Sequence, residues 1–348
     1  MGSKKTWKRK LPNENEVVCE KNFNEFFDVM LERMLIWKRR FIDEQNRPWS
    51  NNNILNKFKF TNVYRMLDRS SQWQIQHILL DESVKGVNLV WKLMVYRMFN
   101  NPETFEKGLK FWKNGIPDYK DYDVNKWYEF IQGIKESGGN PFTNAYLTNS
   151  ASYPGLTRVE SYTKKILPIL HKCIPELYKL MLKAKKPEEI IDFLTSLPSC
   201  GMFMAHEYYQ DFTYIAIFRD DNFFKFTQDD FTNVGPGASL GIRLIFPKLK
   251  GRGQKQGIYW LKEFAEEELE KARVRLGVDG GVPYVQWNKK KGEFEITNKC
   301  NISLHQIEMW LCEYQKYWKM CIGEGKQRSE FEPKTNVKVK CIQTELLL

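Results

Sequence analysis

The stretch Leu197-Pro198-Ser199-Cys200-Gly201-Met202-Phe203-Met204-Ala205 separates two apolar helical segments and decides how the middle of this chain folds. Pro187 is a favourable first residue for the helix that precedes it, and Leu197-Pro198 ends that helix. We expect Gly201 to allow a turn that a Cβ atom would hinder. The whole of 187–212 has the layout of a helix-hairpin-helix. Amides at the start of its second helix can hold a phosphate, so Cys200 and Gly201 are candidate nucleic-acid contacts that read no base sequence.

A second turn rich in glycine and proline lies further along, at 233–241, and opens another helix. Its candidate phosphate-binding residues are Asn233, Gly235 and Gly237; the alternative is an ordinary helix start. The segment that follows, 247–257, is basic and glycine-rich. We predict a loop there, in which Arg252 and Lys255 either contact phosphates or are simply solvated.

The composition favours a polyanionic partner without proving one. The 348 residues carry a formal net charge of +11, and 42% of them are hydrophobic, enough for a substantial core. The seven cysteines form no CxxC pair, and four histidines are too few for a multi-histidine centre, so we predict no metal and no cofactor. We interpret the cysteines as reduced thiols of an intracellular protein.

We expect residues 1–20 to be a basic flexible tail, 21–325 to be one helical domain, and 326–348 to be a second tail. The start Met1-Gly2-Ser3-Lys4-Lys5-Thr6 fits a solvated tail, a nuclear signal or a myristoylation site. No apolar window is long enough to span a membrane. The expected location is intracellular: nuclear in a eukaryote, or the infected cytoplasm for a virus.

Helical spacing of apolar residues dominates the rest of the chain. It predicts helices at 22–41, 60–80, 83–99, 127–134, 160–183 and 187–196. Residues 283–297 predict a β-hairpin, and Ser303 with Gln306 predicts a capping box before the last helix. The expected fold is therefore mainly α, with a small C-terminal β-hairpin.

Several long segments resemble one protein family, and they occur in its order. These are Glu32-Arg33 to Arg39-Arg40, Phe60-Thr61-Asn62-Val63-Tyr64-Arg65-Met66-Leu67-Asp68-Arg69, Tyr96-Arg97-Met98-Phe99-Asn100-Asn101-Pro102-Glu103-Thr104, Pro141-Phe142-Thr143-Asn144-Ala145-Tyr146, 201–211, Asn233 to Gly241, Leu311-Cys312-Glu313-Tyr314-Gln315-Lys316-Tyr317 and Gly323-Glu324-Gly325. Over residues 22–325 the chain resembles the helical domain associated with 5-hydroxymethyluracil DNA kinases. That family is also described as α-glutamyl/putrescinyl thymine pyrophosphorylases, or amino-acid:DNA transferases.

The resemblance implies a fold like that of helix-hairpin-helix DNA glycosylases and a role in building hypermodified thymines. In that chemistry a separate kinase pyrophosphorylates 5-hydroxymethyluracil in DNA, and an amine or amino acid then displaces the pyrophosphate. This chain has no G-x-x-x-x-G-K-[ST] loop, so we do not expect it to be the kinase. It also departs from the pattern in having Ser199 where the glycosylase hairpin has its first glycine, and His206 where aromatic residues are common.

Chemistry on a base requires that the base be flipped out of the duplex into a pocket. Cations must neutralise the leaving pyrophosphate, and a carboxylate must deprotonate or position the amine. The candidate cations are Arg33, Arg40, Arg65 and Arg69, and the candidate carboxylates are Asp68, Glu207 and Asp211.

Structural roles compete with each of these assignments. Arg65, Asp68 and Arg69 have the spacing of surface ion pairs on a helix. Glu32 and Arg33 could form a buried pair, and His206 and Cys312 could be ordinary core residues. Glu207 and Asp211 would repel each other on one helix face unless a partner neutralises them.

Three other functions stay open at this stage. A base-excision glycosylase would use the same carboxylate to stabilise a sugar cation. A non-catalytic module would bind or recognise DNA through the basic surface alone. A structural scaffold would not bind DNA.

Overall fold

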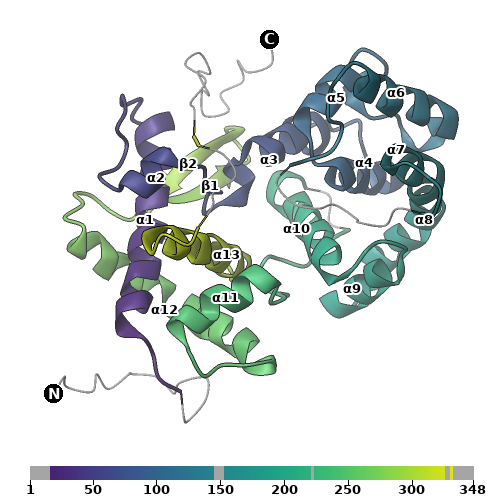
Figure 1. The fold of residues 1–348 in the computed structure, drawn as a ribbon. Coiled ribbons are helices and arrows are strands. Elements are labelled where there is room, and N and C mark those ends of the chain that lie inside the picture. Colours follow the sequence, from purple (N-terminus) through teal and green to yellow (C-terminus); the bar gives the residue numbers. More distant parts are fainter. Residues whose placement is uncertain (1–15, 145–152, 221–222, 326–329, 332–348) are drawn as a thin grey trace. The chain divides into compact units, whose positions relative to one another are not determined.

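The computed structural model describes residues 16–144, 153–220, 223–325 and 330–331. It is mainly helical, with one two-stranded antiparallel sheet near the C-terminus, which confirms the predicted fold class (Figure 1). None of the helices in these ranges combines the length and apolar composition needed to cross a membrane.

The region expected to be one domain divides into two compact units. Unit 1 consists of the segments up to Arg65 and from Thr232 onward, and unit 2 is the continuous segment Met66–Phe231. The division arises because the first long helix packs against the last two helices, while the middle of the chain closes on itself. The expected N-terminal tail is shorter than 1–20, since Glu16 is buried and the Cys19 amide donates to the Ile245 carbonyl at 2.8 Å. Residues 1–15 and 332–348 lie outside the described residues.

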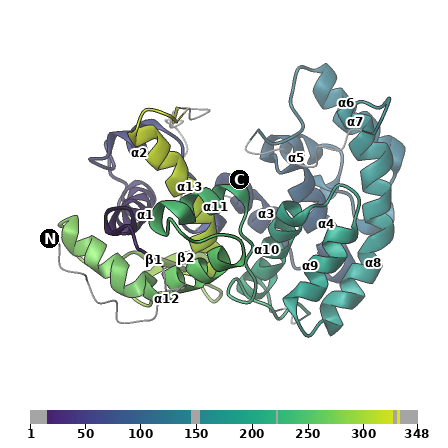
Figure 2. The same cartoon turned by 60° about the horizontal axis from the view of Figure 1, so that its bottom comes forward.

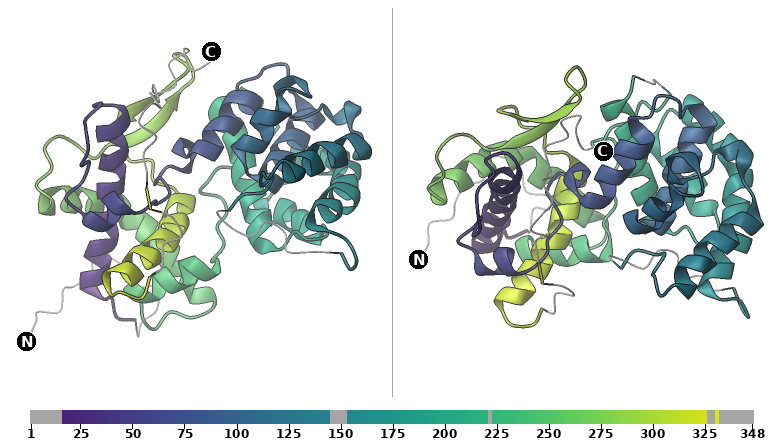
Figure 3. Two further views of the ribbon diagram at one scale, coloured as in Figure 1. Left: turned by 45° about the horizontal axis from the view of Figure 1, so that its top comes forward. Right: turned by 90° about the horizontal axis from the view of Figure 1, so that it is seen from above.

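Unit 1 is built around a long N-terminal helix whose apolar face is buried. Its elements are α1 (Glu20–Phe41), α2 (Asn53–Lys57), α11 (Pro236–Ile245), α12 (Arg252–Arg275), β1 (Tyr284–Asn288), β2 (Glu293–Thr297) and α13 (Leu304–Cys321). Phe23, Phe26 and Phe27 are fully buried, as the spacing of apolar residues predicted, and the Trp310 indole donates to the Phe26 carbonyl at 3.3 Å. The predicted β-hairpin is present (Figure 3), and so is the capping box at Ser303.

The predicted basic loop is partly wrong, because α12 begins at Arg252. Only the first part of 247–257 is therefore a loop, and both Arg252 and Lys255 lie in the opening turns of a helix. The sequence signal failed here because the glycines that suggested a loop include Gly253 and Gly257, which are inside α12. A Cβ atom at Gly257 would lie 2.9 Å from the Leu249 side chain, so this glycine serves close packing.

Close packing of α11 against α13 depends on two glycines. A Cβ atom at Gly241 would lie 2.2 Å from the Leu311 carbonyl oxygen, which is backbone and cannot move aside cheaply. At Gly237 the nearest atom would be the Cys312 sulfur, at 2.9 Å. These glycines allow the two helix backbones to approach more closely than any larger residue would permit.

Unit 2 surrounds two helices that are buried on nearly every side. Its helices are α3 (Arg69–Gln74), α4 (Gly86–Phe99), α5 (Pro102–Gly108), α6 (Val124–Glu136), α7 (Arg158–Glu160), α8 (Leu167–Lys183), α9 (Pro187–Ser196) and α10 (Met202–Phe218). Every residue from Leu89 to Phe99 is buried, and so is every residue from Met204 to Ile215. Helices α4 and α10 pack against each other within this unit (Figures 1 and 2).

The helix predicted at 60–80 is instead three short pieces. Arg65–Leu67 is a 3-10 turn, α3 follows, and Ile75–Leu79 is a π-helix. The interruptions place the Trp73 ring in a stack on Tyr96, with 4.9 Å between ring centroids. Tertiary stacking of this kind overrides local helical spacing, which is the physical reason for the error.

We predict that Gly241→Ala lowers the free energy of unfolding by about 1–3 kcal/mol or more, because α11 must move away from α13. Gly133→Ala is the matched control, since Gly133 is inside α6 and an added Cβ there meets nothing within 4 Å. The control should raise stability by about 0.5–1 kcal/mol. Urea unfolding followed by circular dichroism measures both; equal effects of the two substitutions would contradict the packing argument.

Candidate functional site

The turn between α9 and α10 lies where the sequence predicted it, but its geometry differs. Helix α9 ends at Ser196, the Cys200 amide donates to the Leu197 carbonyl at 3.1 Å, and Gly201 precedes α10. The left-handed residue is Ser199, with φ +61°, whereas Gly201 has φ −74° and open space around a hypothetical Cβ. The expectation that Gly201 relieves a steric hindrance is therefore wrong. The position that departs from the glycosylase pattern, Ser199, is the one with the strained backbone.

Only part of this turn is available to a ligand. The Cys200 side chain is buried beside Tyr208, and burial raises the pKa of its thiol to about 12. Its amide is already used within the turn. By contrast, Met202 and Phe203 are each more than two-fifths exposed, so the start of α10 is at the surface.

Behind this turn, α10 carries both predicted carboxylates into a buried charge cluster. Arg97 of α4 donates from Nε to Asp211 Oδ2 at 2.7 Å and from Nη2 to Asp211 Oδ1. Gln74 adds a bond from Nε2 to Asp211 Oδ2 at 2.9 Å. Arg97 is 1% exposed and Asp211 is fully buried. A bidentate pair of this kind is among the strongest hydrogen-bonded arrangements in proteins.

Glu207 lies beside the same guanidinium. Its Oε2 is 3.4 Å from Arg97 Nη1, and that nitrogen also donates to Asn100 Oδ1 at 3.3 Å. Glu207 is 6% exposed, so of the two carboxylates it is the one nearer to solvent. The ring of the neighbouring residue, His206, is hydrogen-bonded to the Gln210 side-chain amide at 3.1 Å. Glu207 and Asp211 would repel each other without a neutralising cation. Arg97 is that cation.

Arg97 was not among the site residues predicted from the sequence. It lies 114 residues from Asp211 in the chain, within a helix whose other buried residues are apolar except Lys92. The available signal was an arginine in the middle of a buried stretch, because an arginine there must have a partner.

Of the other candidates in unit 2, Asp68 is half-buried and Arg69 is exposed. Arg69 is 63% exposed in its side chain and pairs with Glu103 of α5 at 2.5 Å. Asp68 occupies the position before α3 but makes no capping bond with its side chain. Arg65, Asp68 and Arg69 do not share one helix: Arg65 opens the 3-10 turn at the end of the first segment of unit 1, Asp68 precedes α3, and Arg69 is the first residue of α3.

The remaining candidates belong to unit 1. Arg33 donates to the Phe60 carbonyl at 3.4 and 3.3 Å, and Arg40 lies 4.5 Å from the Phe41 ring centroid. Glu32 pairs with Arg39 at 3.4 Å and not with Arg33, because neighbouring residues on a helix point in different directions.

At the second turn, the Gly235 amide donates to Glu308 Oε1 at 3.4 Å, so a carboxylate of α13 already lies at the start of α11. Asn233 is half-buried just before it. Arg252 is exposed and makes no ion pair or hydrogen bond with another described residue.

Comparison with known proteins places this helical chain in a family. The model of the 5-hmdU DNA kinase helical domain matches residues 20–327, and the chain belongs to that family. It is similar to the 5-hmdU DNA kinase of Bacillus phage SP10, with 28% identity over 304 residues. These residues cover 84% of this chain but only 44% of the phage protein. No solved structure matches the chain. The resemblance inferred from sequence is thus confirmed.

We predict that Asp211→Asn lowers the free energy of unfolding by about 3–5 kcal/mol, because it leaves Arg97 without its buried counter-charge. Asp192→Asn is the matched control, an exposed residue of α9 in the same unit, and should change stability by less than about 0.5 kcal/mol. Chemical denaturation compares the two. A loss below about 1 kcal/mol for Asp211→Asn would show that the pair contributes little.

Proposed function

We propose that this chain binds DNA that contains 5-hydroxymethyluracil, or a derivative of it, and takes part in enzymatic modification of that base. The observation that carries the proposal is the family match over residues 20–327. The name of the phage relative, a 5-hmdU DNA kinase, supports DNA with this base as the partner. The chain spans less than half of that relative, so the kinase activity in the relative's name is not transferred to this chain.

The charge distribution of the described residues supports contact with a phosphate backbone. Arg252 and Lys255 lie at the start of α12, where the helix dipole makes a positive side chain unfavourable and an anion favourable. A phosphate bound there would interact with both the dipole and the side chains. The start of α10 after the 197–201 turn is a second candidate surface, because Met202 and Phe203 are exposed there and the first amides of a helix have no partner within the helix.

For the reaction, we propose transfer of an amine to a pyrophosphorylated hydroxymethyluracil that is flipped out of the DNA. The amine nitrogen bonds to the exocyclic methylene carbon as the bond from that carbon to the pyrophosphate oxygen breaks. The proton lost by the nitrogen passes to a carboxylate. Glu207 is the better candidate for that base, because it is nearer to solvent than Asp211. In this scheme Asp211 acts through Arg97, which it orients, and is a positioning residue.

Base excision is the second candidate function. It would need a carboxylate that reaches the sugar, and Asp211 is fully buried and held by Arg97 and Gln74. This arrangement favours the transfer reaction over excision by Asp211.

Purified protein should release pyrophosphate from pyrophosphorylated hydroxymethyluracil DNA when a suitable amine is supplied, and mass spectrometry should detect the amine on the base. We expect Glu207→Gln to slow release by about 100-fold or more, whereas Asp192→Asn should not change it. Abasic sites in place of an adduct would indicate excision. Absence of pyrophosphate release with every amine tested would contradict the transfer proposal.

Binding to DNA can be tested apart from chemistry. Arg252→Gln should weaken binding about equally for all sequences and reduce the slope of log affinity against log salt concentration by about one, as expected for loss of one phosphate contact. Lys135→Gln, an exposed residue of α6, is the control for the change in net charge. Fluorescence anisotropy over a salt series gives both slopes, and equal slopes for the two variants would exclude Arg252 from the interface.

A further inference from the structure

One stretch of unit 1 carries positive charge that its own sequence does not balance. From 232 to 262 the chain contains no Asp or Glu. Its cations are Arg243, Lys248, Lys250, Arg252, Lys255 and Lys262. The stretch forms α11, the loop after it and the first part of α12. A surface of this composition attracts a polyanion.

One backbone oxygen brings the cations of α11 and α12 together. The Ser239 carbonyl accepts from Arg243 Nε at 3.2 Å and from Gln254 Nε2 at 3.5 Å. The Ser239 hydroxyl also donates to Gln254 Oε1 at 3.0 Å. Because both donors bind the same oxygen, the Arg243 guanidinium lies beside the turn of α12 that carries Arg252 and Lys255.

Most of these cations are at the surface. The exposed ones are Arg243, Lys248, Lys250 and Arg252, and together with the half-buried Lys255 they are called the basic surface below. Among the residues that the structure describes, neither Arg243 nor Arg252 pairs with a carboxylate. Glu16 and Glu308 reach this stretch from other elements, but both are buried and accept from backbone amides. The side chains that face solvent are therefore positive.

An aromatic ring lies on the basic surface. Tyr259 is 42% exposed, and it follows Lys255 by four residues and Arg252 by seven, so the three share one face of α12. The next residue, Trp260, is buried instead, and its ring centroid lies 4.3 Å from that of Phe264. Cations around an exposed ring are the combination with which proteins hold unpaired nucleotides, because the cations contact phosphates and the ring stacks on a base.

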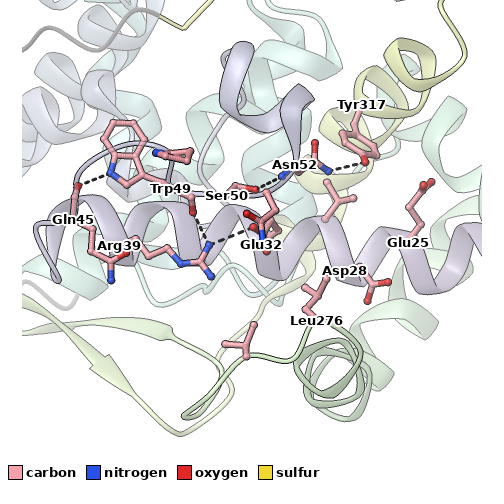
Figure 4. Close-up of a pocket in the computed structure, with 14 residues that line it drawn as sticks. Glu25, Asp28, Glu32, Arg39, Gln45, Trp49, Ser50, Asn52, Leu276 and Tyr317 are labelled. Atoms are coloured by element: carbon pink, nitrogen blue, oxygen red, sulfur yellow. Dashed lines mark hydrogen bonds and ion pairs between the residues drawn. The ribbon is translucent and has the colours of Figure 1, made fainter.

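The far end of α12 has the opposite charge. Acidic residues begin at Glu263, and the helix continues for 24 residues in all, about 36 Å. Leu276, directly after α12, lines a cavity together with Glu25, Asp28 and Glu32 of α1, as Figure 4 shows. Like charges repel, so a polyanion is kept away from this cavity and favoured at the start of α12.

We propose that the basic surface binds single-stranded DNA, with one unpaired base stacked on the Tyr259 ring and neighbouring phosphates held by Arg243 and Arg252. In a duplex, adjacent bases cover the faces of each base, so a duplex would gain the phosphate contacts alone. The inference rests on the proposed function and deepens it, because it names an unpaired strand as the partner. No modified base is required, since stacking on an aromatic ring tolerates every base.

Fluorescence anisotropy of the whole chain with an unmodified labelled oligonucleotide, single-stranded and as the duplex of the same sequence, tests the stacking. Tyr259→Leu keeps an apolar side chain but removes the ring. We expect it to weaken binding of the single strand by about tenfold or more and binding of the duplex by less than about twofold. Tyr259→Phe keeps the ring and should bind the single strand as the unaltered chain does.

Phe111→Leu is the matched control, because Phe111 is a strongly exposed aromatic residue of unit 2, and it should change neither affinity. Unchanged affinity of Tyr259→Leu for the single strand, or equal losses on single strand and duplex, would overturn the inference and leave the proposed function standing. Failure of the unaltered chain to bind either form of DNA would contradict both.

A salt series separates the phosphate contacts from the stacking. With the single strand, Arg243→Gln should reduce the slope of log affinity against log salt concentration by about 0.7, as expected for loss of one phosphate contact. Tyr259→Leu should lower the affinity and leave this slope unchanged, since stacking releases no counterions. An unchanged slope in Arg243→Gln would contradict the place of Arg243 in the basic surface.

Discussion

The ion pair between Arg97 and Asp211 fixes how the two central helices of unit 2 meet. Helices α4 and α10 are buried on nearly all sides, and apolar burial alone is non-directional, so it would tolerate several registers between them. Two parallel hydrogen bonds from one guanidinium to one carboxylate are satisfied in a single arrangement. We interpret the pair as the device that selects this arrangement, at the cost of burying two charges.

Because the ion pair sets how α10 packs against α4, it also sets the positions of the other residues on α10. The helix begins just after the 197–201 turn and carries Glu207 one turn before Asp211. The outward-facing start of the helix and the carboxylate beside Arg97 are therefore parts of one rigid element. A ligand that contacts the surface at the turn would therefore lie at a fixed distance from Glu207, because one helix and no loop connects the two places.

The sequence was sufficient for features that depend on local chemistry. Apolar spacing located α1 and α4, the Ser303 capping box located the start of α13, and Pro187 with Leu197-Pro198 located both ends of α9. These signals come from residues a few positions apart, whose interactions do not depend on how the rest of the chain folds.

Features that depend on distant residues were not predictable in this way. The ion-pair partner of Asp211 is 114 residues away in the chain. Gly241 is needed because a backbone oxygen of α13 lies where a Cβ atom would be. The break in the predicted 60–80 helix serves a ring stack on Tyr96, which no local pattern encodes. Glycine was also ambiguous: Gly201 looked essential to its turn, yet Ser199 adopts the left-handed conformation there.

The discontinuous construction of unit 1 has a consequence for biosynthesis. Helix α1 emerges from the ribosome before the rest of unit 1, and its apolar face packs against α12 and α13, which are made some two hundred residues later. Unit 2 is continuous and can close as soon as Phe231 has emerged. The nascent chain must therefore carry three exposed phenylalanines on α1 while the middle of the protein folds, a period in which a chaperone would have a binding site.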